Sequence, residues 1–399
     1  MKARVINREK AFFIILALYL IQEIFLTRTK IADLLGSNLV DYLVMGIRGL
    51  MLLFAVMKIF FLDRFNIKRM LILGMILSLV GVVTVVSHTT AMLFSFLVII
   101  CSYGVDFKKI VRFDFNIVLC ISIITILLNL TGLISSSTKT RSFLGTVRTS
   151  LGFNHPNTLG MIAFLLIADY IYLNKNKNSK KLIIPILVTV LTFLFSYSFT
   201  AIVLMTALIV VTWFQNLIER RNQMSKARLR LIVFLVLVVF VGVVIFFWQN
   251  PKLLVDEFRT LRSRFTLSQK YINAYGIRLF GNDIVIGSRV NIPGYVNTYG
   301  YLDNGIARIL VELGIVFFIV FFFLYLKSIW KMVAARNTSL IVISLLFLVY
   351  AFMEYNPLMV AYNIFLIQNL KLQYDRTSDR GMNRMTHHQK MIIKGIQNG

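Results

Sequence analysis

Cysteine and acidic residues are both scarce in this sequence, and each scarcity excludes a class of protein. Only Cys101 and Cys120 occur among the 399 residues, and both fall in or beside long apolar runs. A disulfide-stabilised domain is therefore excluded, and both are expected to be small buried side chains without a disulfide. Acidic residues number 17 against 43 lysines and arginines, a formal net charge of +26. These charges lie in short segments between apolar runs rather than on one folded surface, so no nucleic-acid partner is expected.

Signatures of other classes are missing as well. No polar stretch is long enough for a soluble domain, and the sequence has no internal repeat and no low-complexity segment. The stretch "GNDIVIGSRVNIPG" at 281–294 lacks a following Lys-Ser/Thr, so it is not a phosphate-binding loop and transport driven by ATP has no support. No His, Cys and carboxylate cluster has metal-ligand spacing, so neither a metal nor a cofactor is expected.

Apolar residues dominate what is present. They make up 58% of the chain, and the mean hydropathy is +0.78. Windows of about 17 to 25 apolar residues predict about twelve transmembrane helices. The predicted spans are 9–27, 39–61, 70–87, 90–105, 115–134, 156–173, 182–197, 200–217, 230–248, 304–326, 338–355 and 357–371. The sequence thus predicts an all-α polytopic protein of the plasma membrane, with 1–399 as a single membrane domain.

Basic residues orient these spans, because short loops rich in Lys and Arg stay in the cytoplasm. Alternate loops hold most of the lysines and arginines, which predicts a cytoplasmic N-terminus and a basic cytoplasmic tail at 372–399. Two long basic segments, 135–155 and 249–303, are then outer loops. The second lies between the ninth and tenth spans, and its length predicts that it folds on the membrane surface.

Ionisable residues within apolar spans are costly and indicate function. Asp41 and Arg48 are seven residues apart and Arg308 and Glu312 are four apart, so each pair shares a helix face and could form a salt bridge. With the predicted topology all such residues lie toward the outer leaflet; they are Glu23, Asp41, Arg48, Arg308, Glu312 and Glu354. One interpretation is structural ion pairing between helices. The other is an arginine-rich cavity, open to the outer face, that suits a lipid phosphate or diphosphate.

The segment "RTSLGFNHPNTLG", 148–160, enters the sixth predicted span. A residue before proline avoids helical conformation, so the helix is predicted to begin near Pro156. Arg148, His155 and Asn157 would then present donors beside a helix N-terminus, which favours anions. Alternatively, His155 only caps or packs against the helix.

Three ordered motifs resemble the polysaccharide polymerases called Wzy, especially those of capsule and exopolysaccharide clusters, within the O-antigen polymerase and ligase group. They are "RTSLGFNHPNTLG" from Arg148, "RFTLSQKYINAYGIRLFGN" from Arg264 and "YGYLDNGIARILVELGI" from Tyr299. The resemblance implies a GT-C-like glycosyltransferase at the outer face of the plasma membrane. It also implies that the substrates are an undecaprenyl-diphosphate-linked oligosaccharide and the growing polysaccharide. Membrane lipid, and a flippase and a chain-length regulator of the same pathway, are the expected partners.

Site residues follow from the motifs and from the charged positions in the spans. The candidate catalytic residues are Arg148, His155, Arg264, Asp303, Glu312 and Glu354. The candidate substrate-binding residues are Arg141, Asn157, Asn304, Arg308 and Arg48. Arginines are expected to stabilise the leaving diphosphate, whereas a carboxylate or His155 would deprotonate the attacking hydroxyl. The residues alone leave open which group is that base.

A ligase and a flippase are the two alternative functions. The related ligases carry a histidine where this chain has Asp303, which argues against a ligase. A lipid-linked oligosaccharide flippase would also need a basic cavity. However, transporters favour symmetric halves and polar groups at the membrane midplane, whereas this sequence has no repeat and its polar groups lie toward one side.

Overall fold

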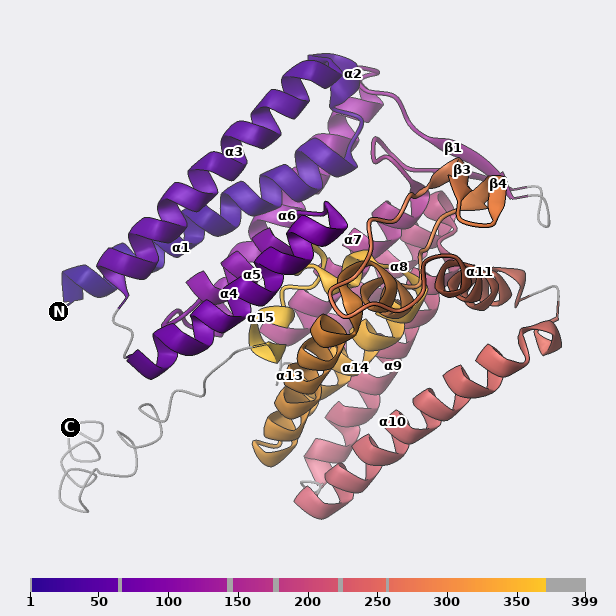
Figure 1. Cartoon of the computed structure of the whole chain (residues 1–399). Coiled ribbons are helices and arrows are strands. Elements are labelled where there is room, and N and C mark those ends of the chain that lie inside the picture. The colour runs from indigo at the N-terminus through magenta and orange to yellow at the C-terminus, as the bar shows by residue number, and fades with distance from the viewer. Residues whose placement is uncertain are drawn as a thin grey trace.

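A computed structural model of the chain describes residues 2–63, 67–141, 146–174, 179–221, 225–255 and 258–370. The predicted tail at 372–399 lies outside this description. The described chain is a bundle of helices with two small β-hairpins (Figure 1). The helices are α1 (Lys2–Leu20), α2 (Ala32–Leu35), α3 (Ser37–Met57), α4 (Ile67–Ser87), α5 (Ala91–Cys101), α6 (Phe107–Leu130), α7 (Pro156–Leu173), α8 (Ile183–Ser196), α9 (Phe199–Arg221), α10 (Lys226–Gln249), α11 (Arg259–Tyr275), α12 (Gly305–Arg308), α13 (Gly314–Ala334), α14 (Thr338–Met353) and α15 (Leu366–Asn369). The hairpins pair β1 (Thr138–Arg141) with β2 (Thr146–Thr149) and β3 (Gly287–Ile292) with β4 (Tyr295–Gly300).

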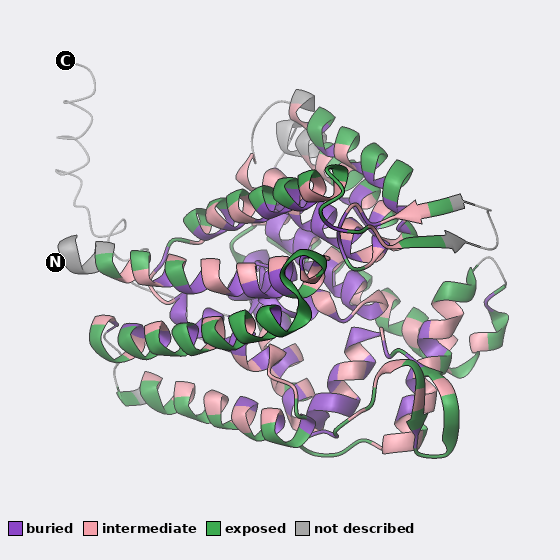
Figure 2. Cartoon of the chain, turned by 90° about the horizontal axis from the view of Figure 1, so that it is seen from above, coloured by how far each residue is buried: buried purple, intermediate pink, exposed green. Residues whose placement is uncertain are grey.

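The helices have the length and surface of a protein embedded in a membrane. Six of the described helical segments are long and apolar enough to cross a bilayer. Buried residues gather in the centre of the bundle, while peripheral helices expose their outer faces (Figure 2). In α10 only Leu229 and Val233 are buried, and Cys120 in α6 is exposed rather than buried as predicted. Such exposed apolar surface is stable only in lipid. The architecture is that of a helical membrane protein.

The twelfth predicted span, 357–371, was wrongly predicted as a helix. Residues 356–370 form two 3₁₀ turns, Asn356–Leu358 and Val360–Tyr362, and the single turn α15. The Asn363 amide donates to the Pro357 carbonyl at 2.9 Å, a side-chain bond that competes with helix formation.

This irregular segment nevertheless runs through the bundle. It starts at the end of α14, and its last turn reaches Ser328, late in α13, whose hydroxyl donates to the Gln368 carbonyl at 3.0 Å. Because Ile364, Phe365 and Leu366 are fully buried, helices cover the segment. Non-helical backbone at membrane depth is tolerated where it is buried within the protein, as it is here.

The two segments predicted as outer loops lie together. The labelled strands β1, β3 and β4 gather with α11 at one end of the bundle, opposite the start of α1 (Figure 1). We call it the hairpin end. The Lys30 amide donates to the Gly152 carbonyl at 2.8 Å, which holds the first segment to the end of the first helix. The second segment forms α11 and the β3–β4 hairpin.

Two acidic residues face each other in the other half of the bundle. Asp114 lies near the start of α6 and Asp169 near the end of α7, and both are fully buried. Their carboxyl groups lie within hydrogen-bonding reach of each other, and no other described group donates to their four oxygens. Two carboxylates buried side by side repel each other, so the arrangement is stable only if at least one of them carries a proton. This pair was not among the ionisable residues that were predicted to lie toward the outer leaflet.

We expect this pair to stabilise the α6–α7 contact. Asp114→Leu leaves the Asp169 carboxyl buried without a partner and should lower the free energy of unfolding by about 1 to 3 kcal/mol. Asp114→Asn retains a donor and should stay near the wild type. Thermal unfolding in detergent measures both, and the double leucine variant should regain most of the loss because it buries no lone carboxyl. A single leucine variant as stable as the wild type would contradict the pairing.

Candidate functional site

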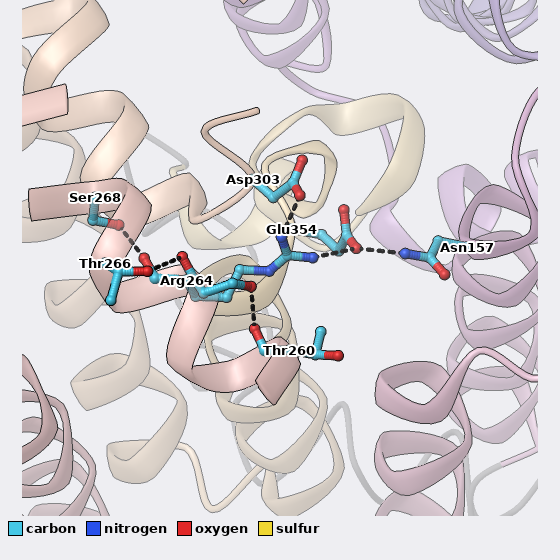
Figure 3. Close-up of polar contacts among 8 residues, drawn as sticks. Asn157, Thr260, Arg264, Thr266, Ser268, Asp303 and Glu354 are labelled. Carbon is cyan, nitrogen blue, oxygen red and sulfur yellow. Dashed lines mark hydrogen bonds and ion pairs between the residues drawn. The ribbon is translucent and has the colours of Figure 1, made fainter. Parts of the chain in front are cut away.

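A chain of polar contacts joins three helices at the hairpin end (Figure 3). Arg148 donates to the Asn157 amide oxygen at 2.6 Å, and the Asn157 amide nitrogen donates to a Glu354 oxygen at 2.9 Å. Arg264 contacts the same Glu354 oxygen at 3.4 Å and forms an ion pair with Asp303. Five residues predicted from separate motifs and from a span end are thus brought together.

Local structure fixes each of these side chains. The β1–β2 hairpin pairs Arg148 with Lys139, and the Arg148 Nε donates to the Ser196 carbonyl at 2.8 Å. Helix α7 begins at Pro156, as predicted, which places Asn157 in its first turn. Glu354 is the residue that follows the last turn of α14. These three side chains are therefore held by helix ends and one short hairpin.

Arg264 is the most enclosed cation of this group. It lies in the middle of α11 with its side chain 9% exposed, and its Nε has no hydrogen-bond partner among the described residues. A guanidinium has five donors in a fixed fork. Because this Nε is buried, an anion beside Arg264 would have to bind the terminal nitrogens, which contact Asp303 and Glu354.

His155 caps α7, and the capping hydrogen bond determines which ring nitrogen carries the proton. Its Nδ1 accepts a hydrogen bond from the Asn157 backbone amide at 3.0 Å. Burial, followed by the charges of Lys139, Arg148 and Arg264, lowers the pKa of His155 to about 4. The ring is therefore neutral at neutral pH, with its single proton on Nε2. This arrangement favours His155 as a hydrogen-bond donor over a base, whereas the sequence left both roles open.

Glu354 has the properties of a base. Burial raises the pKa of its carboxyl to about 7, against the charge of Arg264, while the charge of Asp303 raises it further and the Asn157 hydrogen bond lowers it. A pKa near the working pH is what general base catalysis requires. The other carboxylates differ: Asp303 is engaged by Arg264, and Glu312 is buried in a bidentate pair with Arg308 at 2.6 and 3.1 Å.

Two cavities meet at Asn157 and Glu354. The first, of 310 Å³, has largely apolar walls and also holds Arg148 and Arg264 beside Asn157 and Glu354. We call it the apolar chamber; its walls include Phe199, Val203, Leu204, Leu261 and Met353. The second, of 470 Å³, is the polar chamber, whose walls include Arg28, His155, Tyr299, Tyr301, Asp303 and Arg308.

Arg28 belongs to the polar chamber and was missed at the sequence level. Its Nε donates to the Tyr362 hydroxyl at 3.1 Å and one terminal nitrogen donates to the Asn356 side chain at 3.0 Å. These partners are more than 300 residues away in sequence and belong to the irregular segment after α14. Only its place at the end of an apolar run, beside Thr27 and Thr29, could have suggested it.

Several predicted site residues lie elsewhere or serve the fold. Asn304 caps α12, and its side-chain oxygen is occupied because it accepts from the Ile306 and Ala307 amides at 3.1 Å. Arg48 lies over the Phe94 ring at 5.4 Å and lines neither chamber. The predicted Asp41–Arg48 ion pair is wrong, because Asp41 is exposed on α3 and no bridge joins them. Arg141 lies in β1, but its side chain is outside the described residues.

The predicted Arg308–Glu312 pair is confirmed, and it lies in an unusual backbone. The turns from Ile309 to Leu313 are π-helical and end at Gly314. The Leu-Phe-Gly motif at 279–281 packs against the end of this π-helical segment, since the Val316 amide donates to the Leu279 carbonyl at 3.2 Å. A Cβ on Gly281 would lie 2.0 Å from the Glu312 carbonyl oxygen. The glycine of the motif therefore permits close backbone contact beside the polar chamber.

Gly281→Ala should destabilise the protein by about 2 to 4 kcal/mol, because it adds this overlap to a left-handed backbone conformation (φ +95°). Gly276→Ala is the matched control: its φ is +70°, but no atom lies within 4 Å of its Cβ. It should lose only about 1 to 2 kcal/mol. Unfolding in detergent distinguishes the two, and equal losses would refute the contact.

Comparisons with family models, curated proteins and solved structures find no match for this chain. Within the described ranges, no group of three or more His, Cys, Asp or Glu side chains is placed to hold a metal ion. What the site does must therefore be inferred from its geometry and from the sequence motifs.

Proposed function

We propose that this protein is a Wzy-type polysaccharide polymerase, a glycosyltransferase that joins undecaprenyl-diphosphate-linked oligosaccharide units at the outer face of the plasma membrane. One observation carries the proposal. An apolar chamber with two arginines and a polar chamber with aromatic side chains share the wall that holds Glu354. A reaction between a lipid-linked sugar and a second saccharide needs such a junction.

The apolar chamber suits the donor, the growing chain on its lipid diphosphate. Arginine forks bind phosphate oxygens bidentately, and Arg148 and Arg264 both line this chamber. Its apolar walls favour the first part of a prenyl chain. The leaving diphosphate gains negative charge as its bond to the sugar breaks, so fixed guanidinium groups stabilise the transition state.

The polar chamber suits the acceptor saccharide, and Glu354 lies between the two. The Glu354 carboxylate takes the proton of an acceptor hydroxyl, and the oxygen attacks the anomeric carbon of the donor sugar. The bond from that carbon to the phosphate oxygen breaks, and its electron pair leaves with the diphosphate. Arg264 contacts both Glu354 and Asp303, which couples the base to the anion site.

Accumulating intermediates test this proposal in a deletion strain. A polymerase defect leaves single repeat units on their lipid in the outer leaflet and no long glycan. Unflipped units on the inner face would support a transporter instead. Full-length polymer retained on its lipid would support a ligase.

Sidedness is a separate prediction, because the proposed chemistry is outside the cell. In a background with Cys101→Ala and Cys120→Ala, a cysteine at the exposed Ser288 should react with an impermeant thiol reagent in intact cells. A cysteine at the exposed Ser225, in the loop before α10, should react only after permeabilisation. The opposite labelling pattern would invert the topology and exclude the polymerase.

A further inference from the structure

The polar chamber carries an aromatic pair that the catalytic chemistry does not use. Tyr299 and Tyr301 both line it, with ring centroids 5.2 Å apart and planes inclined by 51°. They remain 55% and 37% exposed. Aromatic rings left open to a polar cavity are costly in water unless a ligand covers them.

The backbone holds these rings in place. Tyr299 is in β4, and Gly300 between the two tyrosines accepts a hydrogen bond from the buried Tyr271 hydroxyl of α11 at 2.8 Å. A Cβ on Gly300 would lie 2.8 Å from that hydroxyl and 2.3 Å from Val290, so the close contact requires glycine. The rings are thus anchored to the helix that carries Arg264.

Hydrogen-bond donors and acceptors both surround the two tyrosine rings. His155 offers its Nε2 proton, and Lys139 is a cationic donor, while Asp303 and Asn356 offer oxygens. A ligand that presents flat C–H faces together with hydroxyl groups satisfies both the rings and these polar groups. Pyranose sugars have this chemistry, whereas a prenyl chain or an isolated phosphate does not.

We infer that Tyr299 and Tyr301 form a clamp for the terminal sugar of the acceptor saccharide and determine which acceptor is used. This inference rests on the proposed polymerase function, and it assigns the acceptor rather than the lipid diphosphate to the polar chamber. The two rings would contact the sugar and leave its hydroxyl directed toward Glu354, which lines the same chamber.

A lipid-free oligosaccharide tests this assignment, because it lacks a leaving group and can act only as an acceptor. The probe is the oligosaccharide released by mild acid from the lipid-linked units of the deletion strain. With purified protein and lipid-linked units, chain transfer to this probe is measured at increasing probe concentration. Tyr299→Ala and Tyr301→Ala should each raise the KM for the probe about tenfold with little change in kcat, a loss of about 1.4 kcal/mol each.

Matched variants separate the clamp from a general effect on the hairpin. Tyr299→Phe and Tyr301→Phe keep the rings and should stay within about threefold of the wild-type KM. Tyr295→Ala, on the same hairpin and 40% exposed but outside the chamber walls, should leave the KM unchanged. An unchanged KM in the alanine variants of Tyr299 and Tyr301 would overturn the clamp.

A binding measurement keeps the clamp distinct from the polymerase activity. Saturation-transfer NMR on detergent-purified protein should show transfer to the probe for the wild type and none for the double alanine variant. Equal transfer in both would overturn the clamp. A wild type that binds the probe through these rings but never extends a chain would overturn the proposed function and leave the saccharide contact supported.

Discussion

Arg264→Ala should reduce chain extension at least about 100-fold while the protein still inserts at its normal level. Removing one preorganised donor from a developing anion typically costs that much or more. Arg264 lines the apolar chamber with its side chain 9% exposed, and its removal leaves Arg148 as the one arginine among the described residues of the chamber walls. Extension by purified protein, with polymer resolved on gels, measures the effect. Arg148→Ala should act in the same direction.

The Arg264→Ala substitution also leaves Asp303 and Glu354 without their shared cation. A second substitution, which keeps the charge, is therefore needed to separate this effect from the loss of phosphate binding. Arg264→Lys keeps the charge but loses the fork, and we expect it to restore only a small part of the rate. Arg259→Ala is the control, because Arg259 is exposed on the same helix α11. If lysine restored full activity, a point charge would suffice and bidentate phosphate binding would be wrong. Wild-type chain length in the variants Arg264→Ala and Arg148→Ala would remove both arginines from the site.

Local sequence rules predicted the features that depend on neighbouring residues. The start of α7 at Pro156 follows from the restriction proline places on the preceding residue, and the Arg308–Glu312 pair follows from helical spacing. Apolar windows located most helices, because each must cover its backbone polar groups in lipid. The same windows failed after α14, because residues 357–370 are predominantly apolar and their hydropathy does not distinguish a helix from a buried irregular segment.

Partners distant in sequence could not be predicted. Glu354 meets Asn157 across 197 residues and Arg264 across 90, and no spacing rule links them. Arg28 and Tyr362 are likewise far apart in sequence, and no spacing rule predicts the hydrogen bond between them. The Asp41–Arg48 spacing was suitable for a pair, but the side chain of Arg48 turns to the Phe94 ring instead. The choice of Glu354 over His155 as the proposed base likewise depends on features that no local spacing encodes, the Nδ1 hydrogen bond of His155 and the burial of Glu354.

Glu354→Gln should lower the rate of chain extension by about 10² to 10⁴-fold, the usual contribution of a general base. Glutamine preserves the size of the side chain and an oxygen that can accept from Asn157, so the loss reports the missing carboxylate. The wild-type rate should also depend on pH. Since the pKa of Glu354 is raised to about 7, the ionised base is lost as the pH falls through 7, and the rate should fall with it. The residual activity of Glu354→Gln should not show this dependence.

The pH dependence distinguishes Glu354 from the other titratable group at the site. His155→Asn keeps a residue that caps helices well, and it removes the imidazole. Because the pKa of His155 is lowered to about 4, its loss should leave the fall in rate near pH 7 in place, while the rate itself decreases modestly through the lost Nε2 donor. If the dependence near pH 7 vanished in His155→Asn and persisted in Glu354→Gln, the histidine would be the base. In that case the ring would have to give up its hydrogen bond from the Asn157 backbone amide before catalysis.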